Sequence, residues 1–245
     1  MSVRVGVVVF PGSNCDKDTA WALERAGAEP VELWHESADL QDVAAIVLPG
    51  GFAYGDYLRA GAIARFSPVM RAVAGYAANA GLVLGICNGF QVLAEAGLLP
   101  GALLRNRSLR FVCRDVAIRA GPTDTPFSHL VRDGRVLRMP VAHGEGCYYA
   151  DAATLDALEQ DGRVLFTYVD DAGQPAGILD RANPNGSVRA IAGVINAAGN
   201  VAGLMPHPER AADVLLGSDD GMLVLRSLVE SAGARAGTIP SGAAG

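Results

Sequence analysis

Two kinds of hydrophobic run alternate in the first hundred residues. Short runs of consecutive apolar, often β-branched residues are typical of strands buried on both faces, whereas apolar residues three or four positions apart are typical of helices. The buried strands expected on this basis are residues 3–10, 31–34, 45–48 and 82–84. Helices are expected at residues 19–26 and 69–80, the second of them after the capping pair Ser67-Pro68. Alternation of strands and helices predicts a parallel sheet covered by helices on both faces.

Polar and apolar positions alternate one by one in the middle of the chain. At residues 111–119 and 135–142 this pattern predicts antiparallel strands with one wet face. The further expected elements are a short helix at 154–159, strands at 164–169, 190–196 and 201–205, a hairpin turn at 197–200, and helices at 210–216 and 221–231. We therefore expect an α/β fold whose central sheet is mostly parallel, with a small antiparallel strand insertion.

Composition narrows the class of protein. Half of the 245 residues are hydrophobic, which is enough for a large core, and the net charge of −6 argues against a general nucleic-acid binder. No repeat or linker interrupts the chain, so we expect one domain over residues 1–232 and a flexible Gly/Ala-rich tail over 233–245. Neither a signal peptide nor a membrane span is visible, and the four cysteines lack a Cys-x-x-Cys spacing. These features predict a soluble, cytoplasmic protein without a metal site.

The strongest chemical signal is the heptapeptide at residues 85–91, which directly follows an expected strand. A strand that turns sharply into a helix with a nucleophile at the bend is a nucleophile elbow, and Cys87 occupies this bend. Gly85 and Gly89, two positions away on each side, leave room for the strained backbone. The start of the following helix favours the reactive thiolate. We expect Cys87 to be a nucleophile; a buried structural thiol between packing glycines is the alternative.

A cysteine nucleophile needs a base and a group that orients the base. The best candidates follow the expected strand at 201–205, where prolines on both sides hold His207 in an extended segment. His207 would exchange a proton with the cysteine, and Glu209 would orient the imidazole, as in a Ser-His-Asp triad. His143 and Glu145 repeat the same spacing, but the glycines beside them offer a poorer support for catalytic geometry.

The oxyanion formed by attack on a carbonyl needs donors that are fixed in advance. The backbone N–H of Asn88, next to the nucleophile, is the first expected donor. The second is expected in the loop at residues 50–52, because two glycines let the backbone turn its N–H groups inward. Cys15 is expected in a loop at the carboxyl edge of the sheet, where most residues are bystanders. Together the elbow, the Gly-Gly loop and the His-x-Glu pair are hard to explain as packing alone.

These motifs resemble the class I, or triad-type, glutamine amidotransferase family, whose pattern is a Gly-x-Cys-x-Gly-x-Gln elbow, an upstream Pro-Gly-Gly loop and a downstream His-Pro-Glu. Further stretches are similar to one branch of the family, the glutaminase subunits of phosphoribosylformylglycinamidine synthase, which act in purine biosynthesis. These stretches are residues 10–16, 49–61, 105–108, 142–146, 183–187 and 204–210. The run at residues 52–61 distinguishes this branch from other amidotransferases.

The resemblance implies a flavodoxin-like fold and a defined reaction. Cysteine attack on the side-chain amide of glutamine releases ammonia, and water then hydrolyses the thioester to glutamate. The implied catalytic triad is Cys87, His207 and Glu209, and the implied oxyanion hole is Gly51 and Asn88. The implied substrate-binding residues are Gln91, Asn106, Ser108 and His143.

The resemblance also implies partners. The family delivers ammonia to a separate synthetase subunit, which uses ATP and Mg²⁺ to convert formylglycinamide ribonucleotide to the amidine, with a small bridging subunit as a further candidate. This chain lacks a Gly-x-x-x-x-Gly-Lys-Ser/Thr loop, so no cofactor is expected in it. We expect partner docking to move the segment between Gly51 and Gly61 and to complete the oxyanion hole.

Two other hypotheses stay open. A different group, of cysteine hydrolases or chaperone-like proteins, shares the elbow, but it lacks the downstream His-Pro-Glu that is present here. A non-enzymatic glutamine-binding subunit with an idle triad would be indicated by the loss of a triad member, and this chain has all three.

Overall fold

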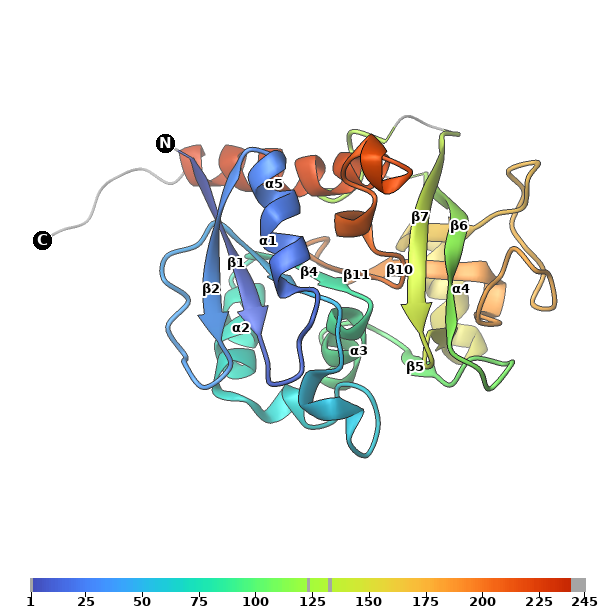
Figure 1. The fold of residues 1–245 in the computed structure, drawn as a ribbon, viewed down its shortest axis with the longest axis horizontal. Coiled ribbons are helices and arrows are strands. Elements are labelled where there is room, and N and C mark those ends of the chain that lie inside the picture. The colour runs from blue at the N-terminus through green and yellow to red at the C-terminus, as the bar shows by residue number, and fades with distance from the viewer. Residues whose placement is uncertain (1, 123, 132–133, 239–245) are drawn as a thin grey trace, which may run out of the picture.

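A computed structural model describes residues 2–122, 124–131 and 134–238. Across these residues, nine strands form one sheet in the order β2-β1-β3-β4-β11-β10-β9-β6-β7 (Figure 1). The first five are parallel, and they are β2 (Ala28–Trp34), β1 (Val3–Val9), β3 (Ala45–Leu48), β4 (Leu82–Ile86) and β11 (Val201–Leu204). Strands β3, β4 and β11 are buried along their whole length, as their apolar runs predict. Because parallel strands end at the same edge, the loops that follow these strands meet there.

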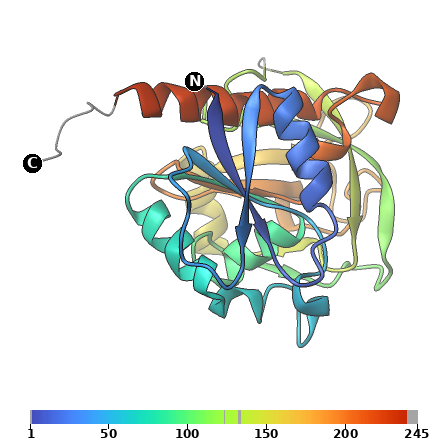
Figure 2. The same ribbon diagram turned by 60° about the vertical axis from the view of Figure 1, so that its left-hand side comes forward.

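Helices cover both faces of the parallel half. Helices α1 (Asp16–Arg25) and α5 (Gly221–Thr238) pack against each other on one face. Helices α2 (Pro68–Ala78) and α3 (Asn88–Glu95) lie on the opposite face, and both contact β4 (Figures 1 and 2). The prediction of a sheet between two helical layers is confirmed. Among the described residues, no helix is long and apolar enough to cross a membrane.

The antiparallel strands continue the same sheet instead of forming a separate one. They are β10 (Ile191–Ile195), β9 (Val164–Tyr168), β6 (Val112–Ala120) and β7 (Val136–His143). Two three-residue strands missed by the sequence analysis, β5 (Ala102–Leu104) and β8 (Cys147–Tyr149), pair in a small second sheet. Helix α4 (Ala152–Gln160) begins where the Asp151 carboxylate accepts the Thr154 N–H at 2.7 Å.

The expected helix at residues 210–216 is wrong. Two short 3₁₀ turns stand there instead, η4 (Pro208–Arg210) and η5 (Val214–Leu216). The reason is that η5 has nothing to bury its apolar side chains against, since Leu215 is 91% exposed. Helix α5 continues past the expected end at residue 231 to Thr238, which includes the first part of the expected tail. The rest of that tail, residues 239–245, lies outside the described residues.

Candidate active site

Cys87 lies at the bend between β4 and α3 with φ 48° and ψ −103°. Non-glycine residues rarely adopt this backbone region, and it stores about 1–3 kcal/mol of strain. The bend is crowded, because a Cβ on Gly89 would lie 2.0 Å from the carbonyl oxygen of Leu48. The Cys87 N–H donates to the Leu204 carbonyl at 2.8 Å and ties the bend to β11. The structure thus has the geometry of a nucleophile elbow at Cys87.

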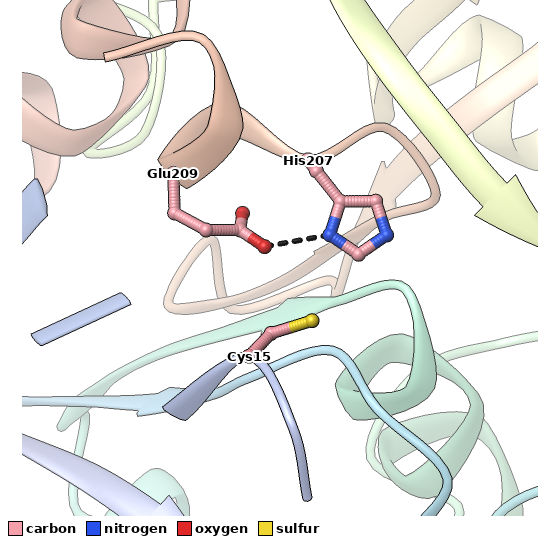
Figure 3. A group of neighbouring side chains, drawn as sticks. All are labelled: Cys15, His207 and Glu209. Atoms are coloured by element: carbon pink, nitrogen blue, oxygen red, sulfur yellow. Dashed lines mark hydrogen bonds and ion pairs between the residues drawn. The ribbon is translucent and has the colours of Figure 1, made fainter. Parts of the chain in front are cut away.

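His207 and Glu209 follow β11, the neighbour of β4 in the sheet. Nδ1 of His207 and Oε1 of Glu209 are 2.6 Å apart, and the two side chains are 2% and 0% exposed (Figure 3). Burial alone lowers the pKa of His207, but the charges of Glu209 and Cys87 raise it well above 6.5. His207 therefore has a carboxylate that holds its Nδ1 proton, and it is close enough to Cys87 for the charge of that thiol to act on the ring.

Cys15 is the neighbour of this pair that the sequence analysis missed. Its Sγ lies within 4.8 Å of ligand atoms of both His207 and Glu209 (Figure 3), and it accepts a hydrogen bond from Nη2 of Arg210 at 3.1 Å. A thiolate, an imidazole and a carboxylate are ligands that Zn²⁺ accepts. Here, however, the His–Glu hydrogen bond occupies two of the donor atoms, and the guanidinium charge beside the sulfur opposes a cation. The arrangement suits proton transfer better than metal binding.

The Gly-Gly loop runs beside the elbow. Gly51 has φ 143°, and a Cβ there would lie 2.9 Å from the Asn14 backbone nitrogen, so only glycine fits. The Phe52 N–H donates to the Gly12 carbonyl at 3.1 Å. Gly51 itself forms an isolated antiparallel bridge with Ser13. The Asn88 N–H, in the first turn of α3, lies beyond the reach of intrahelical acceptors.

The Asn88 side chain fastens the elbow to this loop. Its Oδ1 accepts the Ala53 N–H at 3.0 Å, and its Nδ2 donates to Asp56 Oδ1 at 3.1 Å and to Gln91 Oε1 at 2.9 Å. The Gln91 amide in turn donates to the Glu145 carbonyl. Since Asn88 is buried, these bonds hold three separate segments in register around the nucleophile.

A pocket of about 160 Å³ opens above Cys87 and is lined by residues 51, 52, 56, 87, 91, 111 and 142–145. Two of the four expected substrate-binding residues, Gln91 and His143, lie in its wall. Asn106 lies behind the wall, where its Oδ1 is 3.1 Å from Nδ1 of His143. Ser108 lies on an exposed loop, where its Oγ accepts the Arg110 N–H at 3.3 Å, and it does not line the pocket.

The rival pair, His143 and Glu145, does not form a base and its orienting group. Both ring nitrogens of His143 face amide side chains, those of Asn106 at 3.1 Å and Asn185 at 3.5 Å. Burial, with a smaller effect of His207, lowers the pKa of His143 to about 4. The ring is therefore a neutral part of the pocket wall at pH 7.

Comparisons with known proteins agree on one family. Residues 2–219 match the CobB/CobQ-like glutamine amidotransferase domain. The phosphoribosylformylglycinamidine synthase subunit PurQ of Rubrobacter xylanophilus is 58% identical, over 94% of this chain and 99% of that protein. The subunit PurQ of Salinibacter ruber is 55% identical, over 94% and 97%.

Solved structures agree with the sequence relatives. A chain in the structure of PurLQS from Thermotoga maritima superposes with a TM-score of 0.82 and 44% identity, over 94% of this chain and 99% of that one. A putative GMP synthase protein from Thermoplasma acidophilum, at 13% identity and a TM-score of 0.63 over 97% of each chain, shares the fold. The chain belongs to the CobB/CobQ-like glutamine amidotransferase family, in its branch of phosphoribosylformylglycinamidine synthase PurQ subunits.

Proposed function

We propose that this chain is the glutaminase subunit of a phosphoribosylformylglycinamidine synthase, with a role in purine biosynthesis. The observation that carries the proposal is the arrangement around Cys87. A strained nucleophile elbow follows β4, the charge of its thiol acts on a buried imidazole, and a buried carboxylate lies 2.6 Å from Nδ1 of that imidazole. The pocket above the thiol gives a small substrate access to this group.

In the first half of the proposed reaction, Cys87 Sγ attacks the side-chain amide carbon of glutamine. His207 takes the thiol proton on Nε2 and gives it to the amide nitrogen, so that the carbon–nitrogen bond breaks and ammonia leaves. The products of this half are a glutamyl thioester and free ammonia. Glu209 keeps the Nδ1 proton in place and stabilises the positive charge that forms on the ring.

In the second half, water attacks the thioester carbonyl. His207 takes a proton from the water and returns it to the sulfur, which releases glutamate and restores the thiol. Both halves pass through an oxyanion, and we assign its two donors to the N–H groups of Gly51 and Asn88. Removal of one such donor typically costs about 3 kcal/mol of transition-state stabilisation. The hydrolysis itself uses no cofactor, and ATP and Mg²⁺ belong to the synthetase subunit.

The synthetase subunit is proposed to dock beside the Gly-Gly loop, with a small bridging subunit as a further partner. Tyr57 and Leu58, just beyond that loop, are 72% and 81% exposed. Tyr54, Asp56 and Leu58 have positive φ values of 55°, 51° and 71°, which are uncommon for non-glycine residues. Contact with a partner at these residues would adjust the Gly51 amide and couple ammonia release to synthesis.

The test is ammonia release from glutamine by the purified chain, alone and with the synthetase subunit, ATP and formylglycinamide ribonucleotide. We expect release that rises when the partner is added and disappears in Cys87→Ala. The matched control is Cys113→Ala, which removes an exposed thiol and is expected to keep the native rate. Synthesis from free ammonia shows that the partner is active.

The opposite results would support a binding subunit with an idle triad. In that case Cys87→Ala would still support glutamine-driven synthesis. Full ammonia release by the isolated chain would contradict the proposed coupling to the partner, while leaving the glutaminase activity in place.

A further inference from the structure

We propose that Asp56 and Glu145 together bind the α-ammonium group of the substrate, an inference that rests on the proposed glutaminase function. The two carboxylates come from loops far apart in the sequence, one after β3 and the other after β7. Both line the pocket that contains Cys87. They are therefore placed to act on the same small molecule as the thiol.

The wall of this pocket is negatively charged. Among the described residues that line it, Asp56 and Glu145 are the charged ones, because the His143 ring is neutral at pH 7. Burial and the charge of Glu145 raise the pKa of Asp56 to about 6, which shows that the two negative charges repel each other across the pocket. A bound cation would relieve this repulsion.

The same pocket contains the reactive thiol. Nε2 of His207 is buried and has no hydrogen-bond partner among the described residues. A ligand that carries both an amide and an ammonium would satisfy both the imidazole and the two carboxylates. Arg105, whose Nε is 3.8 Å from Oε1 of Glu145, is 77% exposed, so it leaves acceptor positions of Glu145 to a ligand.

Hydrogen bonds hold both carboxylates in place, and both retain acceptor positions for a ligand. Oδ1 of Asp56 accepts from the Asn88 amide at 3.1 Å, and Oε2 of Glu145 accepts the Ala60 N–H at 3.2 Å. A carboxylate has about four acceptor positions, so each can accept further N–H bonds from an ammonium.

The experiment compares glutamine with glutaramate, which keeps the amide and the carboxylate but lacks the α-ammonium. Asp56→Asn and Glu145→Gln remove charge and keep the shape and an acceptor oxygen. Asp42→Asn is the matched control, since Asp42 has φ 52°, close to the 51° of Asp56, and precedes β3 at the other end of the sheet. KM is measured as ammonia release in the complete complex, and binding is measured by calorimetry on each variant combined with Cys87→Ala.

We expect each charge-removing variant to raise KM and Kd for glutamine about 10- to 100-fold, as for the loss of a hydrogen bond to a charged group. The values for glutaramate should stay within about threefold, and Asp42→Asn should match the native chain for both ligands. Equal losses for the two ligands, or no loss for either, would overturn the ammonium site. If the native complex released no ammonia while the glutamine-specific loss of binding remained, the proposed function would fail and the ammonium site would stand.

Discussion

Replacing Glu209 with glutamine tests the role of the buried imidazole–carboxylate pair. The two side chains are 2.6 Å apart and almost completely shielded from water, so solvent does not screen their interaction. Burial opposes a charge on His207, and the Glu209 carboxylate offsets that effect. Glutamine keeps the size of the side chain and an acceptor oxygen but loses the charge. We therefore expect the pKa of His207 to fall in Glu209→Gln.

The size of the effect follows from the burial. Removing one partner of a buried ion pair costs about 3–5 kcal/mol. Each 1.4 kcal/mol of lost transition-state stabilisation lowers a rate about tenfold. If the cost falls on the imidazolium that forms during the reaction, kcat should drop by about 10² to 10⁴. The equivalent change in a Ser-His-Asp triad lowers kcat by about 10⁴.

The assay is steady-state ammonia release from glutamine by the complete complex, with synthesis from free ammonia as the control. KM should change little, because Glu209 does not line the pocket. Synthesis from free ammonia should keep its native rate, because the change leaves the partner untouched. A variant that retains more than about a tenth of the native kcat would refute the reasoning. Its loss of transition-state stabilisation would be below about 1.4 kcal/mol, whereas about 3–5 kcal/mol is expected for a buried ion pair.

Three further changes have defined outcomes. Gly89→Ala would place a Cβ 2.0 Å from the Leu48 carbonyl oxygen, so we expect the free energy of unfolding in urea to drop by about 3 kcal/mol or more. Gly75→Ala, in an open position of α2, should be neutral or stabilising. An equal loss of unfolding free energy in Gly75→Ala and Gly89→Ala would contradict the expected clash at Gly89. The pKa of His143 is 6.5 in the unfolded chain and about 4 in the folded chain. The neutral ring therefore contributes its full stability above pH 6.5, and this stability is lost as the pH falls to about 4. That loss of unfolding free energy should approach about 3 kcal/mol. His143→Gln should flatten the dependence of the unfolding free energy on pH between about 6.5 and 4, and an unchanged dependence would mean that another group is responsible. Cys15→Ser keeps an acceptor for Arg210, so ammonia release should stay within about tenfold of native, and its complete loss would give Cys15 a direct chemical role.

The local features of the active site could be predicted because short-range rules govern them. Strand β3 has the bounds expected from its four apolar residues, since Pro49 and two glycines end the run. The elbow could be found because the bend itself requires Gly85 and Gly89. The extended segment around His207 likewise follows from its flanking prolines.

Features that depend on strand order could not be predicted in the same way. Cys15 comes close to His207 because β1, β3, β4 and β11 are consecutive in the sheet, which no local pattern encodes. The bond from the Glu145 carboxylate to the Ala60 N–H also joins two segments that are distant in sequence. The wrong helix at 210–216 has a related cause, since an apolar run such as Val214–Leu216 does not reveal whether a surface is available to cover it.

The pairing of β4 with β11 has a consequence for the order in which the protein is made. The ribosome synthesises Cys87 long before His207, and the parallel strand that carries the imidazole to the thiol is the last one of the sheet to emerge. A growing chain therefore carries Cys87 without its catalytic base until the final strand joins the sheet. Labelling by a glutamine-like electrophile such as 6-diazo-5-oxonorleucine should fail for chains that stop at Asn200 and succeed for chains that extend to Thr238; labelling of the shorter chains would contradict this view. The fold thereby delays glutamine cleavage until the chain that cleaves it is almost complete.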